Sequence, residues 1–281
     1  MPDPKPTPRK SAATRAASRL EPPPVARGHT AKEAAPGSKP APQSRKTPEA
    51  KAVPLPKAPK ADLPEPVGPE ILLETFRRFH AMEPEPKGEL EHVNPYTLLV
   101  AVVLSAQATD AGVNKATRAL FQVADTPQKM LDLGEERLLE HVKSINFFRT
   151  KAKNVIALSR RLVEEFGGEV PASIEILETL PGVGRKTASV VVNMAFGIPR
   201  IAVDTHIFRV ANRIPFVATK EPLETQEALE GLVPDEFRLH AHHWLILHGR
   251  YTCKARLPEC WRCPIRDLCR YEPKTLTPVG S

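Results

Sequence analysis

Proline distribution is the feature that most limits what this chain can fold into. Sixteen of its 31 prolines lie in residues 1–67, and none of its 15 aromatic residues does. A segment with so many prolines and so little apolar surface to bury cannot offset the entropy lost on ordering. We therefore expect residues 1–67 to form a disordered tail and the packed fold to begin after it.

The net charge of the chain also lies in this tail. The chain carries 40 basic and 33 acidic residues, of which residues 1–67 hold 13 and six. Residues 68–281 therefore hold 27 of each sign, so the basic isoelectric point is no evidence that the folded part binds nucleic acid. The tail is interpreted either as a solvated linker or as a basic arm that loosely tethers polyanions.

After residue 67 the pattern is helical nearly throughout. Asn94-Pro95 predicts a helix start before the apolar run 96–104, and Thr126-Pro127 repeats that signature. Apolar residues recur at spacings of three and four from 155 to 166, and Gly167-Gly168 predicts the helix end. No alternating strand pattern is found, so we expect an all-α fold with two small cores. The mean hydropathy of −0.31 and the lack of a long apolar run argue against a membrane protein.

The string Leu180-Pro-Gly-Val-Gly-Arg-Lys-Thr-Ala188 lies between two amphipathic segments. Gly182 and Gly184 allow a tight turn that exposes backbone N–H groups at the start of a helix. These amides and the helix dipole favour an anion, which Arg185 also contacts. A plain helix–helix turn is the alternative. The four-residue spacer of a Walker A loop is missing between the glycines.

Four cysteines lie within 17 residues, with six, two and five residues between them. They are Cys253, Cys260, Cys263 and Cys269. Four thiolates hold either zinc or an iron–sulfur cluster, and the spacing alone leaves both open. Disulfides are the alternative, but nothing else in the sequence indicates secretion.

Together with the glycine string, three further motifs resemble the endonuclease III family of helix-hairpin-helix DNA glycosylases. They are Ser105-Ala-Gln-Ala-Thr-Asp110, Ile201-Ala-Val-Asp-Thr-His-Ile-Phe-Arg-Val210 and His243-Trp-Leu-Ile-Leu-His-Gly-Arg-Tyr-Thr-Cys253. The resemblance runs from about residue 69 to about 272. It implies two helical domains that flank a cleft: a six-helix domain, 89–198, and a cluster domain, 68–88 plus 199–272. Residues 273–281 would form a short C-terminal tail.

The resemblance also implies a bifunctional activity: excision of oxidised pyrimidines through a lysine Schiff base, followed by strand cleavage by β-elimination. On its own Lys186 is better explained as a phosphate contact, but the resemblance reverses this preference, because Lys186 falls at the family's nucleophile. At the first turn of a helix a protonated amine is disfavoured, which leaves a neutral amine able to attack. Asp204 precedes an expected helix over 205–212 and suits an N-cap. The family places its catalytic carboxylate there.

Two loops are expected to fill the gap that a flipped nucleotide leaves, because lost stacking must be offset. The resemblance assigns this role to Gln107 and, in the sequence Ile145-Asn-Phe-Phe148, to Phe147. Asn146 replaces the family's usual glycine, and asparagine tolerates the left-handed backbone that such a turn needs. The alternative is that Phe147 and Phe148 are both buried.

The same resemblance implies a [4Fe-4S] cluster on the four cysteines, with Lys254 and Arg256 presented to DNA phosphates; otherwise these are two solvated charges. The expected partner of a monomeric enzyme is double-stranded DNA with oxidised pyrimidines or abasic sites, in the bacterial cytoplasm at the nucleoid. Two alternatives are an adenine glycosylase-like enzyme, whose family lacks a lysine at position 186, and a non-enzymatic DNA-binding module. Four histidines, His240, His242, His243 and His248, suggest packing and phosphate contact more than a metal site.

Overall fold

Ten α-helices and one short 3₁₀ helix account for the regular structure of residues 64–278, the part that this computed structural model describes. No strand occurs in that range, so the expected all-α fold is confirmed. Of the tail predicted for residues 1–67, the part up to Leu63 lies outside the described residues. The predicted end of the tail is wrong at Val67, which is buried in the second core and whose N–H donates to Pro215 O at 2.9 Å. Within 64–278, none of the helices combines the length and apolar composition that a membrane crossing requires.

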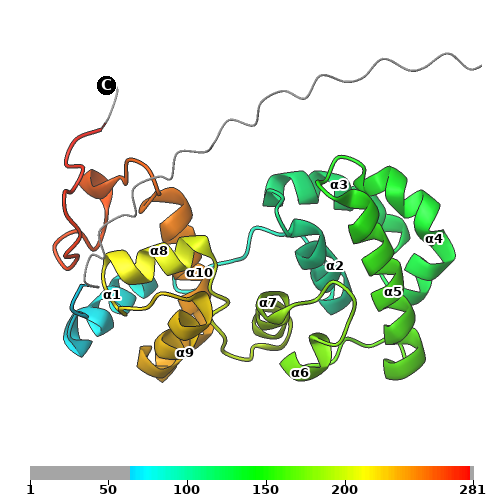
Figure 1. The fold of residues 1–281 in the computed structure, drawn as a ribbon, viewed down its shortest axis with the longest axis horizontal. Helices are drawn as coiled ribbons and strands as arrows, with labels where there is room; N and C mark the ends of the chain where they lie inside the picture. Colours follow the sequence, from blue (N-terminus) through cyan, green and yellow to red (C-terminus); the bar gives the residue numbers. More distant parts are fainter. Residues whose placement is uncertain (1–63, 279–281) are drawn as a thin grey trace, which may run out of the picture. The chain divides into compact units, whose positions relative to one another are not determined.

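The helices divide between two hydrophobic cores (Figure 1). The first core is built by α2 (Pro95–Ser105), α3 (Asp110–Val123), α4 (Pro127–Val142), α5 (Phe148–Phe166), α6 (Ile174–Leu177) and α7 (Arg185–Phe196). The second is built by α1 (Pro69–Met82), α8 (Thr205–Arg213), α9 (Pro222–Leu232), α10 (Asp235–Tyr251) and the cysteine loop, which includes the 3₁₀ helix η1 (Cys260–Arg262). In the described residues the chain therefore contributes α1 to the second core, then forms the first core, and finally returns to the second core with α8 to η1.

The helix ends follow the local sequence signals. The Asn94 side chain accepts a hydrogen bond from Thr97 N, and the Thr97 hydroxyl accepts one from Asn94 N, so α2 begins in a full capping box. Thr126 caps α4 through Lys129 N. Gly167 ends α5 in the left-handed conformation, with φ of 62°. The predicted boundaries at these three points are confirmed.

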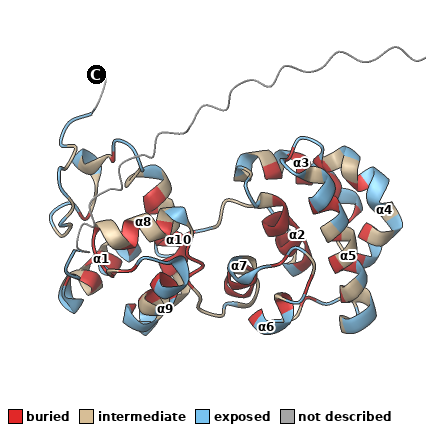
Figure 2. Ribbon diagram, in the orientation of Figure 1, coloured by how far each residue is buried: buried red, intermediate tan, exposed pale blue. Residues whose placement is uncertain are grey.

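Helix α2 forms the centre of the first core. Every residue from Tyr96 to Leu104 is buried, which explains a run without amphipathic alternation (Figure 2). Helix α7 packs against α2 and carries its own N-terminus toward the second core. The Asn193 side-chain amide of α7 donates to Leu239 O of α10 at 3.0 Å. This bond ties α7 directly to α10.

Candidate active site

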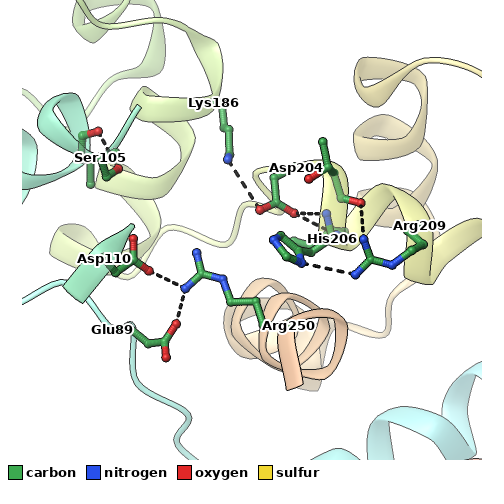
Figure 3. Close-up of polar contacts among 11 residues, drawn as sticks. Glu89, Ser105, Asp110, Lys186, Asp204, His206, Arg209 and Arg250 are labelled. Atoms are coloured by element: carbon green, nitrogen blue, oxygen red, sulfur yellow. Dashed lines mark hydrogen bonds and ion pairs between the residues drawn. The ribbon is translucent and has the colours of Figure 1, made fainter. Parts of the chain in front are cut away.

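Lys186 and Asp204, 18 residues apart in sequence, meet at the N-termini of two helices (Figure 3). Lys186 is the second residue of α7, and Asp204 is the N-cap of α8. The Lys186 Nζ lies 3.7 Å from Asp204 Oδ2. The polypeptide between them runs along α7 and turns back through residues 197–203, which returns Asp204 to the end where α7 starts.

Asp204 is held rigidly, whereas Lys186 is not. Oδ1 of Asp204 accepts hydrogen bonds from His206 N at 2.8 Å and Ile207 N at 2.9 Å. Only 10% of the Asp204 side chain is exposed, against 55% for Lys186. The carboxylate is thus fixed by two backbone amides, with one oxygen left to face the amine. A nucleophile beside a fixed base is the arrangement that covalent catalysis by lysine needs.

The glycine string forms the turn between α6 and α7, and its two glycines differ in what requires them. Gly182 has φ of 77°, and a Cβ there would lie 2.7 Å from the Asn154 side-chain nitrogen, so the fold itself requires glycine. Gly184 has φ of −102° and nothing within 4 Å of its Cβ position. The protein would accommodate a side chain at 184. Its absence leaves the amides at the start of α7 open to a ligand, as an anion site requires.

Arg185, next to Gly184, is exposed and lies 3.6 Å from Glu178 in a loose ion pair. Such a surface pair contributes little to stability and is readily exchanged for a phosphate. The structure therefore brings together the glycine turn, Arg185 and Lys186 on one helix start.

The two loops expected to fill a vacated stack lie side by side. Gln107 and Phe147 are both exposed, Phe147 by 64%, and both have left-handed backbone with φ of 56° and 57°. The Asn146 side chain donates to Gln107 O at 3.3 Å and joins the loops. Phe148 packs against the first core instead. The alternative in which both phenylalanines are buried is wrong for Phe147.

The expectation about Asn146 needs correction. The left-handed residue of this turn is Phe147, one position later, and Asn146 serves as a hydrogen-bond donor between loops. A bulky residue at positive φ is strained. The hydrogen bond from Lys151 N–H to Phe147 O, in the first turn of α5, helps to hold Phe147 in this conformation.

Lys151 is a buried residue beside the site that the sequence pattern did not single out. Its side chain is buried, and Nζ donates to Leu104 O at 2.9 Å and to Ala106 O at 2.6 Å. Burial lowers the pKa of this amine. The ammonium thereby satisfies carbonyls at the C-terminus of α2 and fixes the chain just before Gln107. The available signal was the position of Lys151 four residues before Val155, on the core-facing stripe of α5.

A cavity of about 200 Å³ lies beside Lys186. Its walls come from α2, α7, α10 and residues 87–90, and Gln107 lies at its edge. At one end Arg250 of α10 forms ion pairs with Glu89 and with Asp110 of α3 (Figure 3). These pairs join the second core to the first across the cavity.

The four cysteines form no disulfide and all line one small cavity. Arg213 Nη1 approaches Cys253 Sγ at 3.7 Å, and the Tyr271 N–H points to Cys269 Sγ at 3.4 Å. Burial raises the pKa of the Cys263 thiol to about 11. Thiolates in this position need a positive centre to compensate them, so the donor set suits an iron centre or zinc.

The two basic residues of the cysteine loop differ in their surroundings. Lys254 Nζ contacts Glu259 Oε1 at 2.5 Å and is half-buried. Arg256 is exposed and has no ion pair within residues 64–278. Arg256 is free to make the predicted phosphate contact, whereas Lys254 would first have to break its ion pair with Glu259.

The comparisons with known proteins agree with this arrangement. Residues 100–235 match the model of the HhH-GPD superfamily of base excision DNA repair proteins. The chain is 59% identical to endonuclease III of Treponema pallidum over 194 residues, covering 69% of the chain and 92% of that relative. It is 54% identical to endonuclease III of Escherichia coli over 202 residues, covering 72% and 96%. A solved trapped endonuclease III–DNA covalent intermediate matches with a TM-score of 0.68 and 43% identity, over 73% of this chain and 96% of that one.

Alanine substitutions at the two glycines should have opposite effects. Gly182→Ala should lower the free energy of unfolding by about 1–2 kcal/mol, because alanine is strained at positive φ and meets Asn154. Gly184→Ala should leave the melting temperature unchanged and weaken binding of a duplex oligonucleotide, because its methyl group covers the open amides. Thermal melting and a binding titration check both. Equal destabilisation by the two variants would contradict the assignment of Gly184 to ligand contact.

Proposed function

The chain belongs to the endonuclease III family of base-excision DNA glycosylases and apurinic/apyrimidinic lyases, and we propose that Lys186 is its nucleophile and Asp204 its catalytic carboxylate. The observation that carries the proposal is the 3.7 Å approach of Lys186 Nζ to Asp204 Oδ2 at two facing helix starts. The substrate is double-stranded DNA with an oxidised pyrimidine or an abasic site.

Excision begins when the damaged nucleotide leaves the duplex stack and its sugar reaches Lys186. The neutral Nζ attacks C1′, the bond from C1′ to the base breaks, and the base leaves with the electron pair and takes up a proton. Asp204 Oδ2 is placed to accept a proton from the amine and to stabilise the positive charge that develops on the sugar. Because His206 N and Ile207 N hold Oδ1, no reorganisation of this carboxylate is needed.

Strand cleavage follows from the covalent intermediate. The sugar ring opens, and the nitrogen at C1′ becomes an imine. The imine makes the C2′ proton acidic, so a base can remove it. The electron pair then forms the C2′–C3′ double bond, and the 3′ phosphate leaves. Water finally hydrolyses the imine and restores Lys186.

Binding of the duplex is assigned to three groups of contacts. The amides next to Gly182 and Gly184, with Arg185, hold one phosphate. Gln107 and Phe147 occupy the vacated stack. Arg256, and Lys254 after it leaves Glu259, contact further phosphates. The protein acts as a monomer, and a DNA-repair enzyme with bacterial relatives would work at the nucleoid in the cytoplasm.

The domain limits proposed for this arrangement are 89–198 for the six-helix domain and 68–88 plus 199–272 for the cluster domain. Residues 1–66 and 273–281 would be tails, because Val67 is buried in the second core. The division of the buried residues supports the other limits, since one core spans 96–192 and the other comprises residues 67–79 and 201–265.

The cofactor proposed for the four cysteines is a [4Fe-4S] cluster held by Cys253, Cys260, Cys263 and Cys269. When bound, it supplies the positive centre that compensates four thiolates and fixes the loop that carries Arg256. The surroundings support this: Arg213 donates to Lys254 O at 2.6 Å and Ala255 O at 2.8 Å, and Arg78 of α1 forms a bidentate pair with Asp267.

Lys186→Ala should retain duplex binding but lose both strand cleavage and covalent trapping by borohydride. The reason is that the amine forms the imine, whereas the phosphate site consists mainly of backbone amides. The neighbouring Arg185→Ala is the matched control: it should weaken binding and still be trapped. Trapping gels with an abasic duplex check both. Trapping of Lys186→Ala at the level of the unsubstituted enzyme would refute the assignment, and would reopen the two alternative functions.

Phe147→Ala should slow excision of an oxidised pyrimidine, because removal of the ring loses stacking worth about 1–3 kcal/mol. Cleavage of a pre-formed abasic site should slow less, since no base has to be extracted. The melting temperature should stay the same because Phe147 is 64% exposed. Phe148→Ala is the matched control: it should lower stability by about 2 kcal/mol and affect both activities together. A melting loss for Phe147→Ala with equal losses in both rates would contradict the stacking role.

The purified enzyme should be yellow-brown, with broad absorption near the edge of the visible and ultraviolet ranges, because four thiolates ligate iron. Iron and acid-labile sulfide should be present in equal amounts. Cys260→Ser should lose colour and iron. A colourless, fully active preparation with one zinc per chain would overturn the cluster.

A further inference from the structure

Two histidines of α10 are unusual among the buried polar side chains of residues 64–278. His242 is 4% exposed and His243 7% exposed. Nδ1 of His242 and both ring nitrogens of His243 are buried without a hydrogen-bond partner. Buried polar atoms normally find partners, because leaving them unpaired costs stability. An unpaired group that is retained needs an explanation.

Both histidines line the cavity beside Lys186. They share one face of α10 with Ile246 and Arg250, and α7 forms the opposite wall with Lys186 and Thr187. The cavity, of about 200 Å³, has several times the ~30 Å³ that one water molecule occupies in the liquid. It is therefore large enough for an organic ring that enters next to the amine.

The other histidines of α10 have ordinary roles. His248 lies 3.9 Å from Cys263 Sγ and packs on Phe79. His240 packs on Trp244 with ring centroids 5.7 Å apart, and it does not line this cavity. Simple packing therefore explains His240 and His248, but not the pair that lines the cavity.

Burial keeps the pair neutral. Desolvation, with the charges of His243, Lys186 and Arg250, lowers the pKa of His242 to about 3, and burial lowers that of His243 to about 4. A neutral imidazole has one donor and one acceptor, and the partner of one nitrogen normally decides which nitrogen carries the proton. Nδ1 of His242 has no such partner, so nothing in the protein fixes the tautomer. Nε2 of His242 is not among the fully buried unpaired atoms and forms no hydrogen bond within residues 64–278, so it is the nitrogen available to donate to or accept from a ring in the cavity.

We propose that His242, backed by His243, is a specificity-determining residue that hydrogen-bonds the edge of the flipped pyrimidine. This rests on the proposed function, because the base joined to C1′ must lie beside Lys186. Thymine-derived lesions present an N–H between two carbonyl oxygens, and cytosine-derived lesions present an acceptor nitrogen beside an amine. A ring with a free tautomer is complementary to both, so one residue serves oxidised pyrimidines of either origin.

The test compares two rates on the same protein: base release from a duplex with one thymine glycol, scored after hot alkali, and cleavage of a duplex with a pre-formed abasic site. His242→Phe keeps the ring and removes both nitrogens. Excision should fall about tenfold relative to abasic cleavage, the loss expected for one hydrogen bond. The melting temperature should stay the same or rise, because unpaired polar atoms leave the interior. Repeating the assay with 5-hydroxycytosine should show a similar loss.

Two variants serve as controls. His240→Phe should leave the ratio of the two rates unchanged, and His242→Gln, which retains a donor and an acceptor, should recover part of the excision. The ratio does not depend on the folded fraction, so partial unfolding does not obscure it. An unchanged ratio in His242→Phe, or equal loss of both rates, would overturn the proposal. An unsubstituted enzyme that neither traps nor cleaves abasic DNA would instead refute the proposed function.

Discussion

The meeting of two helix N-termini is the constraint on which the site depends. Each N-terminus has unpaired amides and a positive dipole end. At α8 Asp204 uses two of these amides. At α7 Gly184 leaves them open. One helix start therefore fixes a carboxylate, the other is free to receive a phosphate, and Lys186 lies between them. The carboxylate, the phosphate and the amine that the reaction needs are therefore positioned by helix geometry more than by side-chain networks.

Departures from local rules concentrate around the same place. Within residues 64–278 three non-glycine residues have positive φ, and two of them are Gln107 and Phe147. Of the four buried side-chain atoms without partners in that range, three belong to His242 and His243. Strained backbone and unpaired polar atoms cost stability and persist where function needs them. The buried ammonium of Lys151 is part of this arrangement, since it anchors the turn at Gln107.

The helices were predictable because their signals are local. Asn94, Thr126 and Gly167 each act within five residues, so the sequence pattern was sufficient. The meeting of Lys186 and Asp204 in one cleft was expected only with the help of the family resemblance, because spacing alone cannot show that the chain turns back between two cores. The expectation of left-handed backbone at Asn146 was wrong for a different reason. Residue preferences favour asparagine at positive φ, but in this turn the Asn146 side chain bonds to Gln107 O and the left-handed residue is Phe147. Lys151 was missed because a lysine in a helix usually points to solvent.

Formal neutrality of residues 68–281 limits how the folded part can attract a polyanion. Many of its cations are already paired, among them Arg78, Arg118, Arg161 and Arg250. Attraction over more than a Debye length, about 8–10 Å at physiological salt, depends on net charge, and the net charge lies in residues 1–67. Close contact depends on different groups: the open amides of α7, Arg185 in its loose pair, and Arg256. Long-range attraction of DNA and its placement at close range thus depend on different parts of the chain. Placement at close range requires no excess of positive charge.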